Sequence, residues 1–240
     1  MSYRFKVSLF VLGLFSALYA MPTMFQSVES EQATLLQKGD EKPYCPNCGM
    51  NLVKFFKTSH AARLKNGEVR QYCSLHCLVD ERMEGYLKDK ENLIDQILVV
   101  DTKSLELINA KEAIYVIGSD RPATMSRQSE YAFKNRADAQ EFVKAYGGEM
   151  MDFAKAYALK KAEHEADKEM IRKKREVKLY PKAEKVYEES CDKQALSNLH
   201  VHTIAELKAH LIQSDVCKKV DEGLAQALAI YIWDKRYTAR

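Results

Sequence analysis

Two pairs of cysteines in the first half of the chain constrain its fold more than any other feature. Cys45 and Cys48 are separated by two residues, and a proline and a glycine beside them favour a tight turn in which both sulfurs face one point. Cys73 and Cys77 have the i, i+4 spacing that puts two side chains on one face of a helix, here at its start. A hairpin predicted between the pairs can bring all four sulfurs together.

Four converging thiolates suit zinc, copper(I) or an iron–sulfur cluster. Zinc would close a structural tetrahedron, and one disulfide within each pair is the alternative for an oxidised protein without metal. Met50 lies two residues after Cys48, and a thioether is a soft ligand that copper(I) accepts and zinc rarely uses. His76 lies within the second pair and could add an imidazole ligand. We therefore expect copper(I), with zinc as the rival.

Residues 43–152 are predicted to form an α+β domain. Asn66 and Gly67 separate two apolar runs, which is a strong hairpin signal, and Ser74 is expected to cap the helix that follows. The order of the predicted elements gives one or two small units of β-β-α-β type. The expected strands are residues 53–57, 61–64, 69–72, 96–101, 105–108, 113–118 and 131–133, and the expected helices are residues 74–87 and 138–146.

The N-terminal stretch, residues 1–20, resembles an export signal with a short basic region, an apolar run and a small residue at its end. We expect cleavage because Pro22 follows at once; the alternative is an uncleaved segment that tethers the protein to a membrane. Both interpretations place the rest of the chain outside the cytoplasm, and we expect a periplasmic protein. Residues 21–42 are polar and are interpreted as a linker.

The C-terminal part is predicted to be helical. Residues 153–180 carry charge nearly all round, which indicates a solvent-bridging helical linker that ends near Pro181. Residues 181–240 predict a small all-α domain with helices at 203–212 and 225–237. In an oxidising compartment Cys191 and Cys217 are expected to form a disulfide.

The same C-terminal segment resembles a small c-type cytochrome, on residues 183–191 and 227–233. The haem-attachment signature is missing, because Gln194 and Ala195 stand where cysteine and histidine would be. The resemblance therefore implies a domain without covalent haem that serves docking or structure.

Charge and motif content exclude several function classes. The chain has 37 basic and 34 acidic residues, mixed along its length, so nothing favours nucleic-acid binding. No Ser-His-Asp set, phosphate-binding glycine loop or paired-carboxylate pattern stands out, and we expect no catalytic residues and no enzyme. A thiol–disulfide enzyme is disfavoured because its Cys-x-x-Cys usually opens a helix after a strand, whereas this pair precedes a hairpin.

Residues 45–50 read Cys-Pro-Asn-Cys-Gly-Met and begin a series of motifs that runs to about residue 152. The later motifs are residues 115–119, 122–125 and 131–133, then Ala139, Phe142, Gly147 and Gly148. In this order they resemble the NosL family, the copper-binding accessory proteins of nitrous oxide reductase. The resemblance covers residues 43–152 and leaves the C-terminal part outside.

The resemblance implies an exported copper(I) carrier that helps to supply the copper sites of nitrous oxide reductase or another copper-accepting protein. Copper ligation in the family is attributed to the Cys-Gly-Met motif and to a methionine in the second half, which correspond to Cys48, Met50 and Met125. The additional pair, Cys73 and Cys77, could instead complete a four-thiolate site. Both ligand sets stay open at this point.

Overall fold

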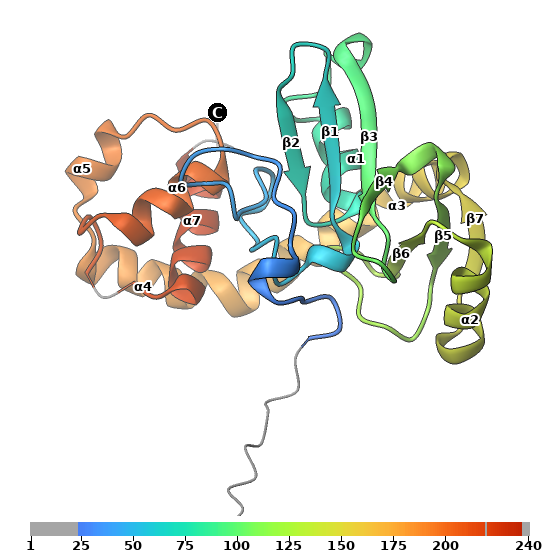
Figure 1. Ribbon diagram of the computed structural model, residues 1–240. Coiled ribbons are helices and arrows are strands. Elements are labelled where there is room, and N and C mark those ends of the chain that lie inside the picture. The colour runs from blue at the N-terminus through green and yellow to red at the C-terminus, as the bar shows by residue number, and fades with distance from the viewer. Residues whose placement is uncertain (1–23, 219, 237–240) are drawn as a thin grey trace, which may run out of the picture.

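The computed structural model describes residues 24–218 and 220–236. It shows an α+β domain joined through a long helix to a small helical domain, which confirms the predicted fold class (Figure 1). The expected export signal, residues 1–20, lies outside the described residues. Among the helices that the structure describes, none has the length and apolar character needed to cross a membrane.

The α+β domain contains two successive units with the same β-β-α-β order. The first unit comprises β1 (His60–Leu64), β2 (Val69–Tyr72), α1 (Leu75–Met83) and β3 (Ile94–Val100). The second comprises β5 (Ile114–Ile117), β6 (Glu130–Phe133), α2 (Arg136–Tyr146) and β7 (Glu149–Asp152). The antiparallel sheets have the orders β2-β1-β3-β4 and β6-β5-β7, where β4 is Leu107–Asn109. In each unit the first strand therefore lies between the other two.

Local sequence signals account for the start of the first unit. Gly67 adopts a φ of +86° in the turn between β1 and β2, a conformation that glycine reaches without strain. The Ser74 hydroxyl accepts a hydrogen bond from the Cys77 N–H, so Ser74 caps α1 as predicted. The helix ends at Met83, earlier than expected, because the chain then turns back and the Leu87 N–H bonds the Glu81 carbonyl.

Residues 53–57 do not form the predicted strand. The Asn51 side-chain oxygen accepts hydrogen bonds from the N–H groups of Val53 and Lys54, which turns the backbone at that point. A short 3₁₀ helix, Phe56–Thr58, follows and buries Phe56. The apolar, β-prone composition of this segment thus reflects burial in a turn.

The residues expected to form a linker pack against the domain. Phe25 lies in edge contact with Tyr131, with ring centroids 5.4 Å apart, and Gln26 is buried. Further along, the Leu36 N–H donates to Gln71 Oε1 and the Gln71 N–H donates to Gln37 Oε1. Residues 24–42 therefore cover the edge strand β2 and part of the second unit, instead of acting as a free tether.

The long helix α3 (Phe153–Lys174) bridges the two domains. A helix exposed to solvent on all sides was expected, but one face of α3 is buried. Ala156, Lys160, His164 and Asp167 recur at helical spacing and pack towards α1 and the second sheet. The helix does not end near Pro181. It continues through a π-helical turn, Arg175–Leu179, into α4 (Tyr180–Ser190), with Pro181 in the first turn of α4.

The buried face of α3 is held by an ion-pair cluster. The Lys160 ammonium lies 2.7 Å from Glu130 Oε1 and 3.2 Å from Asp167 Oδ2. All three side chains are at most 2 % exposed. Removing one member leaves uncompensated charge in the core.

We expect the Lys160→Met variant to lose about 3 kcal/mol of unfolding free energy, because Glu130 would lose its buried counter-charge and Asp167 would keep only the half-exposed Arg127. Urea denaturation checks this. The neighbouring Lys161→Met is the matched control, because Lys161 is exposed and its loss should change stability by less than about 0.5 kcal/mol. Equal effects of the two substitutions would contradict a stabilising role for the cluster.

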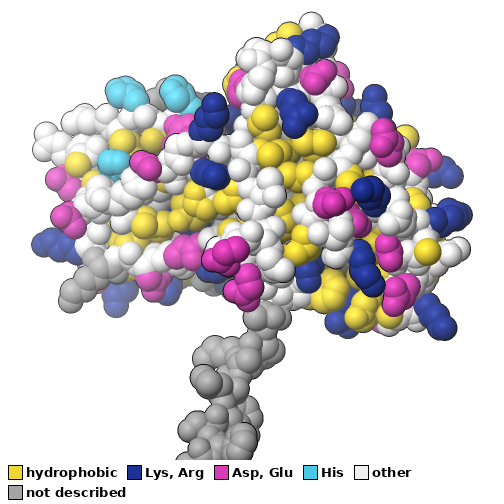
Figure 2. Space-filling view, in the orientation of Figure 1, with side chains coloured by type: hydrophobic (Ala, Val, Ile, Leu, Met, Phe, Trp, Pro, Cys, Tyr) yellow, Lys and Arg dark blue, Asp and Glu magenta, His cyan; other side chains and the backbone are white. Residues whose placement is uncertain are grey.

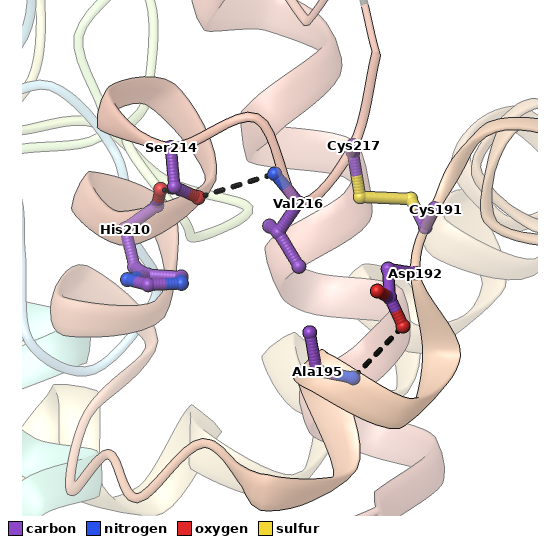
Figure 3. The surroundings of a disulfide bond; sticks show 7 residues. All are labelled: Cys191, Asp192, Ala195, His210, Ser214, Val216 and Cys217. Atoms are coloured by element: carbon purple, nitrogen blue, oxygen red, sulfur yellow. Dashed lines mark hydrogen bonds between the residues drawn. A yellow bond between two sulfur atoms is a disulfide. The ribbon is translucent and has the colours of Figure 1, made fainter.

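The helical domain is formed by α4, α5 (Lys193–Asn198), α6 (Ile204–Gln213) and α7 (Glu222–Arg236). Cys191, after α4, and Cys217, after α6, are joined in the disulfide expected from the sequence (Figure 3). The Asp192 carboxylate accepts from the Ala195 N–H and caps α5 beside this bond. The disulfide therefore ties the end of α4 to the chain between α6 and α7. The likeness to a c-type cytochrome stays a prediction.

Candidate metal centre

The two cysteine pairs converge in the core of the first unit. Sγ of Cys48 lies 3.4 Å from that of Cys73 and 3.7 Å from that of Cys77, and the Cys73 and Cys77 sulfurs are 3.6 Å apart. With Cys45, all four sulfurs lie within 4.8 Å of one another. Each cysteine is 0 % exposed, and all four are free thiols. The sequence prediction of a converging cluster is met by the geometry.

The loop of the first pair is folded so that both of its sulfurs point inward. The Gly49 N–H donates to the Cys45 carbonyl at 2.7 Å, and the Cys45 N–H donates to the Met50 carbonyl at 2.9 Å. Gly49 has a φ of +72°, which a residue with a side chain adopts only under strain. The second pair is placed by β2, which ends just before Cys73, and by the first turn of α1.

The thiols have different acidities. Burial acts to raise the pKa of Cys48, but hydrogen bonds from the other three thiols and from the Met50 backbone outweigh it and lower this pKa well below its usual value. Burial raises the pKa of Cys73, and hydrogen bonding with Cys45 and the other thiols raises that of Cys77. A metal ion binds thiolates, so metal binding must release protons from those thiols that carry one beforehand.

The sulfur spacing fits a thiophilic metal ion. Tetrahedral sulfurs about 2.3 Å from a zinc ion are about 3.8 Å apart, close to the 3.4–3.7 Å found among Cys48, Cys73 and Cys77. Copper(I) is also bound by such soft ligands. The donor set therefore suits either metal, and a small contraction or expansion of the cluster would accommodate both.

The two candidate methionine ligands lie on the hydrophobic core that surrounds the cysteines. Met50 and Met125 are half-buried and pack against the hydrophobic core that contains the four cysteines. Met125 has a φ of +57° in the loop before β6. This loop is tied to the first unit, because the Thr58 hydroxyl hydrogen-bonds Thr124 Oγ1 at 2.9 Å and the Cys73 carbonyl at 2.8 Å. The second unit thus places Met125 on the same hydrophobic core that contains the cysteine pairs.

His76 lies in a different environment from the sulfurs. Its ring stacks on that of His164 from α3, with centroids 5.6 Å apart, and its Nδ1 lies 3.9 Å from Asp167 Oδ2. Burial lowers the pKa of His76 to about 4. The structure groups the four sulfurs together and directs His76 towards α3.

A hydrogen-bond chain that the sequence did not reveal leads from α3 to the cysteine loop. His164 Nε2 lies 2.7 Å from Asp80 Oδ1, and Asp80 Oδ2 accepts from the Asn47 side chain at 2.6 Å. Asn47 lies between the first two cysteines. The available signal was the helical spacing of Lys160, His164 and Asp167, which marks a buried face on a charged helix. This chain fixes the outer side of the loop.

A second group of donors is less suited to hold a metal. His164, Glu84 and Glu165 have ligand atoms within 4.8 Å of one another, but both carboxylates are exposed. The Lys168 ammonium pairs with Glu84 at 2.5 Å and lies 3.9 Å from Glu165. A cation is already supplied there by the protein, so the cysteine cluster is the candidate centre.

His60 has a structural role beside the site. Its Nδ1 lies 3.0 Å from the Thr58 carbonyl and its Nε2 lies 3.1 Å from the Tyr115 hydroxyl. Burial lowers the pKa of His60 to about 4, because the protonated ring is poorly solvated at 1 % exposure. The neutral ring is therefore part of the folded core.

We expect this histidine to make the fold acid-sensitive. The folded pKa of about 4 lies below the unfolded value of about 6.5, so its contribution is present above pH 6.5 and is lost as pH falls towards 4. Between pH 7 and pH 5 the loss is about 2 kcal/mol. Urea denaturation at both pH values should show a smaller loss in His60→Gln than in the wild type. The control His200→Gln alters an exposed ring and should match the wild type; the same pH dependence in all three proteins would contradict the assignment.

An α+β fold around four buried free thiols defines a cysteine-rich protein with a candidate metal centre. The chain belongs to the NosL family, whose model matches residues 37–158, about half of the sequence, and the family predicted from the motifs is thereby confirmed. Among solved structures it is similar to the crystal structure of the copper chaperone NosL from Shewanella denitrificans, with 22 % identity, TM-score 0.38, and coverage of 49 % of this chain and 92 % of that one. A search of curated proteins found no match.

Proposed function

We propose that this protein is a metallochaperone that binds copper(I) and passes it to an acceptor protein. The observation that carries the proposal is the cluster of four free, fully buried thiols inside the domain that the NosL family model matches. Thiolates are soft ligands that select copper(I) among the abundant metals, together with zinc. The NosL protein of known structure is itself described as a copper chaperone.

The ligand set that the cluster favours is Cys45, Cys48, Cys73 and Cys77, since these sulfurs already lie within 4.8 Å of one another. Met50 and Met125 are the alternative donors that the family resemblance implies, and both pack against the core that contains the cysteines. A carrier has to give its metal away, and a thioether ligand holds copper(I) more weakly than a thiolate does. Substitution of the two kinds of ligand separates these roles.

A structural zinc site is the second candidate, because the sulfur spacing is close to that of a zinc tetrahedron. In that case the domain would act as a docking module whose metal stays in place. Thiol–disulfide catalysis fits less well, because all four thiols are 0 % exposed and a substrate disulfide could not reach them.

Anaerobic titration of the reduced protein against a copper(I) chelator tests the proposal. We expect one copper(I) per chain, and Cys48→Ser should weaken binding by more than the roughly 100-fold typical of losing a hydrogen bond to a ligand. Met50→Leu and Met125→Leu should have small effects on affinity if four thiolates hold the metal, and large effects if the methionines are ligands.

Met83→Leu is the control, because Met83 packs on the same core without being a candidate ligand. Zinc that binds tightly and that copper(I) does not displace would overturn the chaperone proposal in favour of the structural site.

We further infer that the protein works outside the cytoplasm and that its acceptor is nitrous oxide reductase. The acceptor follows from the family resemblance. The compartment is supported by the apolar N-terminal segment and by the Cys191–Cys217 disulfide, since disulfides persist in oxidising compartments.

A transfer experiment tests the acceptor. Copper(I)-loaded protein is incubated with copper-free nitrous oxide reductase, and the copper content and activity of the reductase are measured after separation. We expect transfer from the wild type and none from Cys48→Ser. Equal transfer to an unrelated copper-free protein would contradict a dedicated partner, and recovery of the protein in the cytoplasmic fraction of its host would contradict export.

A further inference from the structure

The helical domain lies directly against the cysteine loop (Figure 1). Tyr44, just before the first cysteine, packs in a small cluster with Ala205 and Ala209 of α6. Figure 2 shows hydrophobic side chains gathered on the visible face where the helical domain meets the N-terminal segment. The domain lies beyond residues 37–158, so this contact is outside the region that the family model matches.

Two side chains of the helical domain bond the backbone of the loop. Gln226 Nε2, on α7, donates to the Cys48 carbonyl at 2.6 Å. The Lys208 ammonium, on α6, donates to the Gly49 carbonyl and to Gln226 Oε1, both at 3.0 Å. Two successive carbonyls of the cysteine loop, those of Cys48 and Gly49, therefore accept hydrogen bonds from the helical domain.

The bond from Lys208 is a buried one. This lysine is 2 % exposed, and its ammonium lies 4.1 Å from the centre of the Tyr44 ring. Burying a lysine costs free energy that apolar packing would not, so its presence indicates that its hydrogen bonds matter at this position. Removal of the donor leaves the Gly49 carbonyl without this partner.

The edge of the same interface is held by Glu222 of α7. Its carboxylate accepts from the Asn51 side chain at 2.6 Å and from the Lys54 ammonium at 2.7 Å. Residues of α6 and α7 thus contact the loop from Tyr44 to Lys54 along its length.

The loop and α6 also approach each other closely at Gly49. A Cβ atom there would lie 2.9 Å from Cγ2 of Ile204, at the start of α6. Because Gly49 has a positive φ as well, its lack of a side chain serves both the turn and the contact with the helical domain.

We propose that the helical domain is a cap on the cysteine loop. In this cap Lys208 and Gln226 are positioning residues that hold the Cys48–Gly49 backbone, so that the Cys48 sulfur faces the other three sulfurs. Fixing the Cys48 carbonyl fixes the peptide plane beside its Cα, and with it the direction of the side chain. The cap also excludes other thiophiles from the cluster. Its effect on copper(I) rests on the proposed function, whereas its effect on the thiols does not.

The first test uses the reduced protein without metal. Gln226→Leu and Lys208→Met keep side-chain volume and remove the donors. Because loss of a hydrogen bond makes local opening of the loop roughly tenfold more populated, we expect alkylation of Cys48 by iodoacetamide, read by peptide mass spectrometry, to be faster by the same factor than in the wild type. Gln213→Leu and Lys218→Met are the matched controls, because both residues are exposed in the same domain. Both controls should react at the wild-type rate.

The second test measures transfer of bound copper(I) to a chelator. We expect release to be roughly tenfold faster in the same two variants, whereas Lys208→Arg, which keeps a donor, should stay close to the wild type. Fluorescence of Trp233, the single tryptophan, which lies on α7, reports whether the helical domain remains folded.

Wild-type alkylation rates in folded Gln226→Leu and Lys208→Met would overturn the cap. If these variants are alkylated faster but the wild type binds no copper(I), the cap stands and the proposed cargo fails. If copper(I) binds and leaves all variants at the wild-type rate, with no change in alkylation, the carrier function stands and the cap fails.

Discussion

The close approach of four sulfur atoms in the protein interior is the constraint on which the rest of the structure depends. Thiols within 4.8 Å of one another satisfy each other only weakly, so their positions have to be imposed by the surrounding backbone. A turn at Gly49, the end of β2 and the cap of α1 impose them from within the first unit. The second unit and the helical domain then hold these three elements against one another.

Much of the α+β domain could be predicted because its signals are local. The Asn66-Gly67 turn and the Ser74 cap need only a few neighbouring residues to take effect, and both are where the sequence placed them. The strand prediction for residues 53–57 was wrong because one side chain, that of Asn51, turns the backbone in spite of a β-prone composition. The packing of Phe25 on the domain was not predicted, because a single aromatic residue in a polar segment carries no periodic signal.

The candidate site was predictable to the same extent. The spacing within each pair and the hairpin predicted between the pairs were enough to bring the four cysteines together. His76 is adjacent to Cys77 in sequence, and neighbouring residues on a helix point about 100° apart, so it faces α3. Its neighbour His164, and the contacts of Lys208 and Gln226 with the loop, join residues far apart in the chain and leave no pattern in either segment.

The uninterrupted helical path from α3 through Arg175–Leu179 into α4 has a consequence for how the sequence can change. It is a rigid connection of fixed length, with α1 and the second sheet packed along its first part and the helical domain at its other end. Inserting or deleting one residue in its exposed middle would rotate everything beyond by about 100° and shift it by about 1.5 Å. Substitutions at its solvent-facing positions should be tolerated freely, whereas a change in length should not.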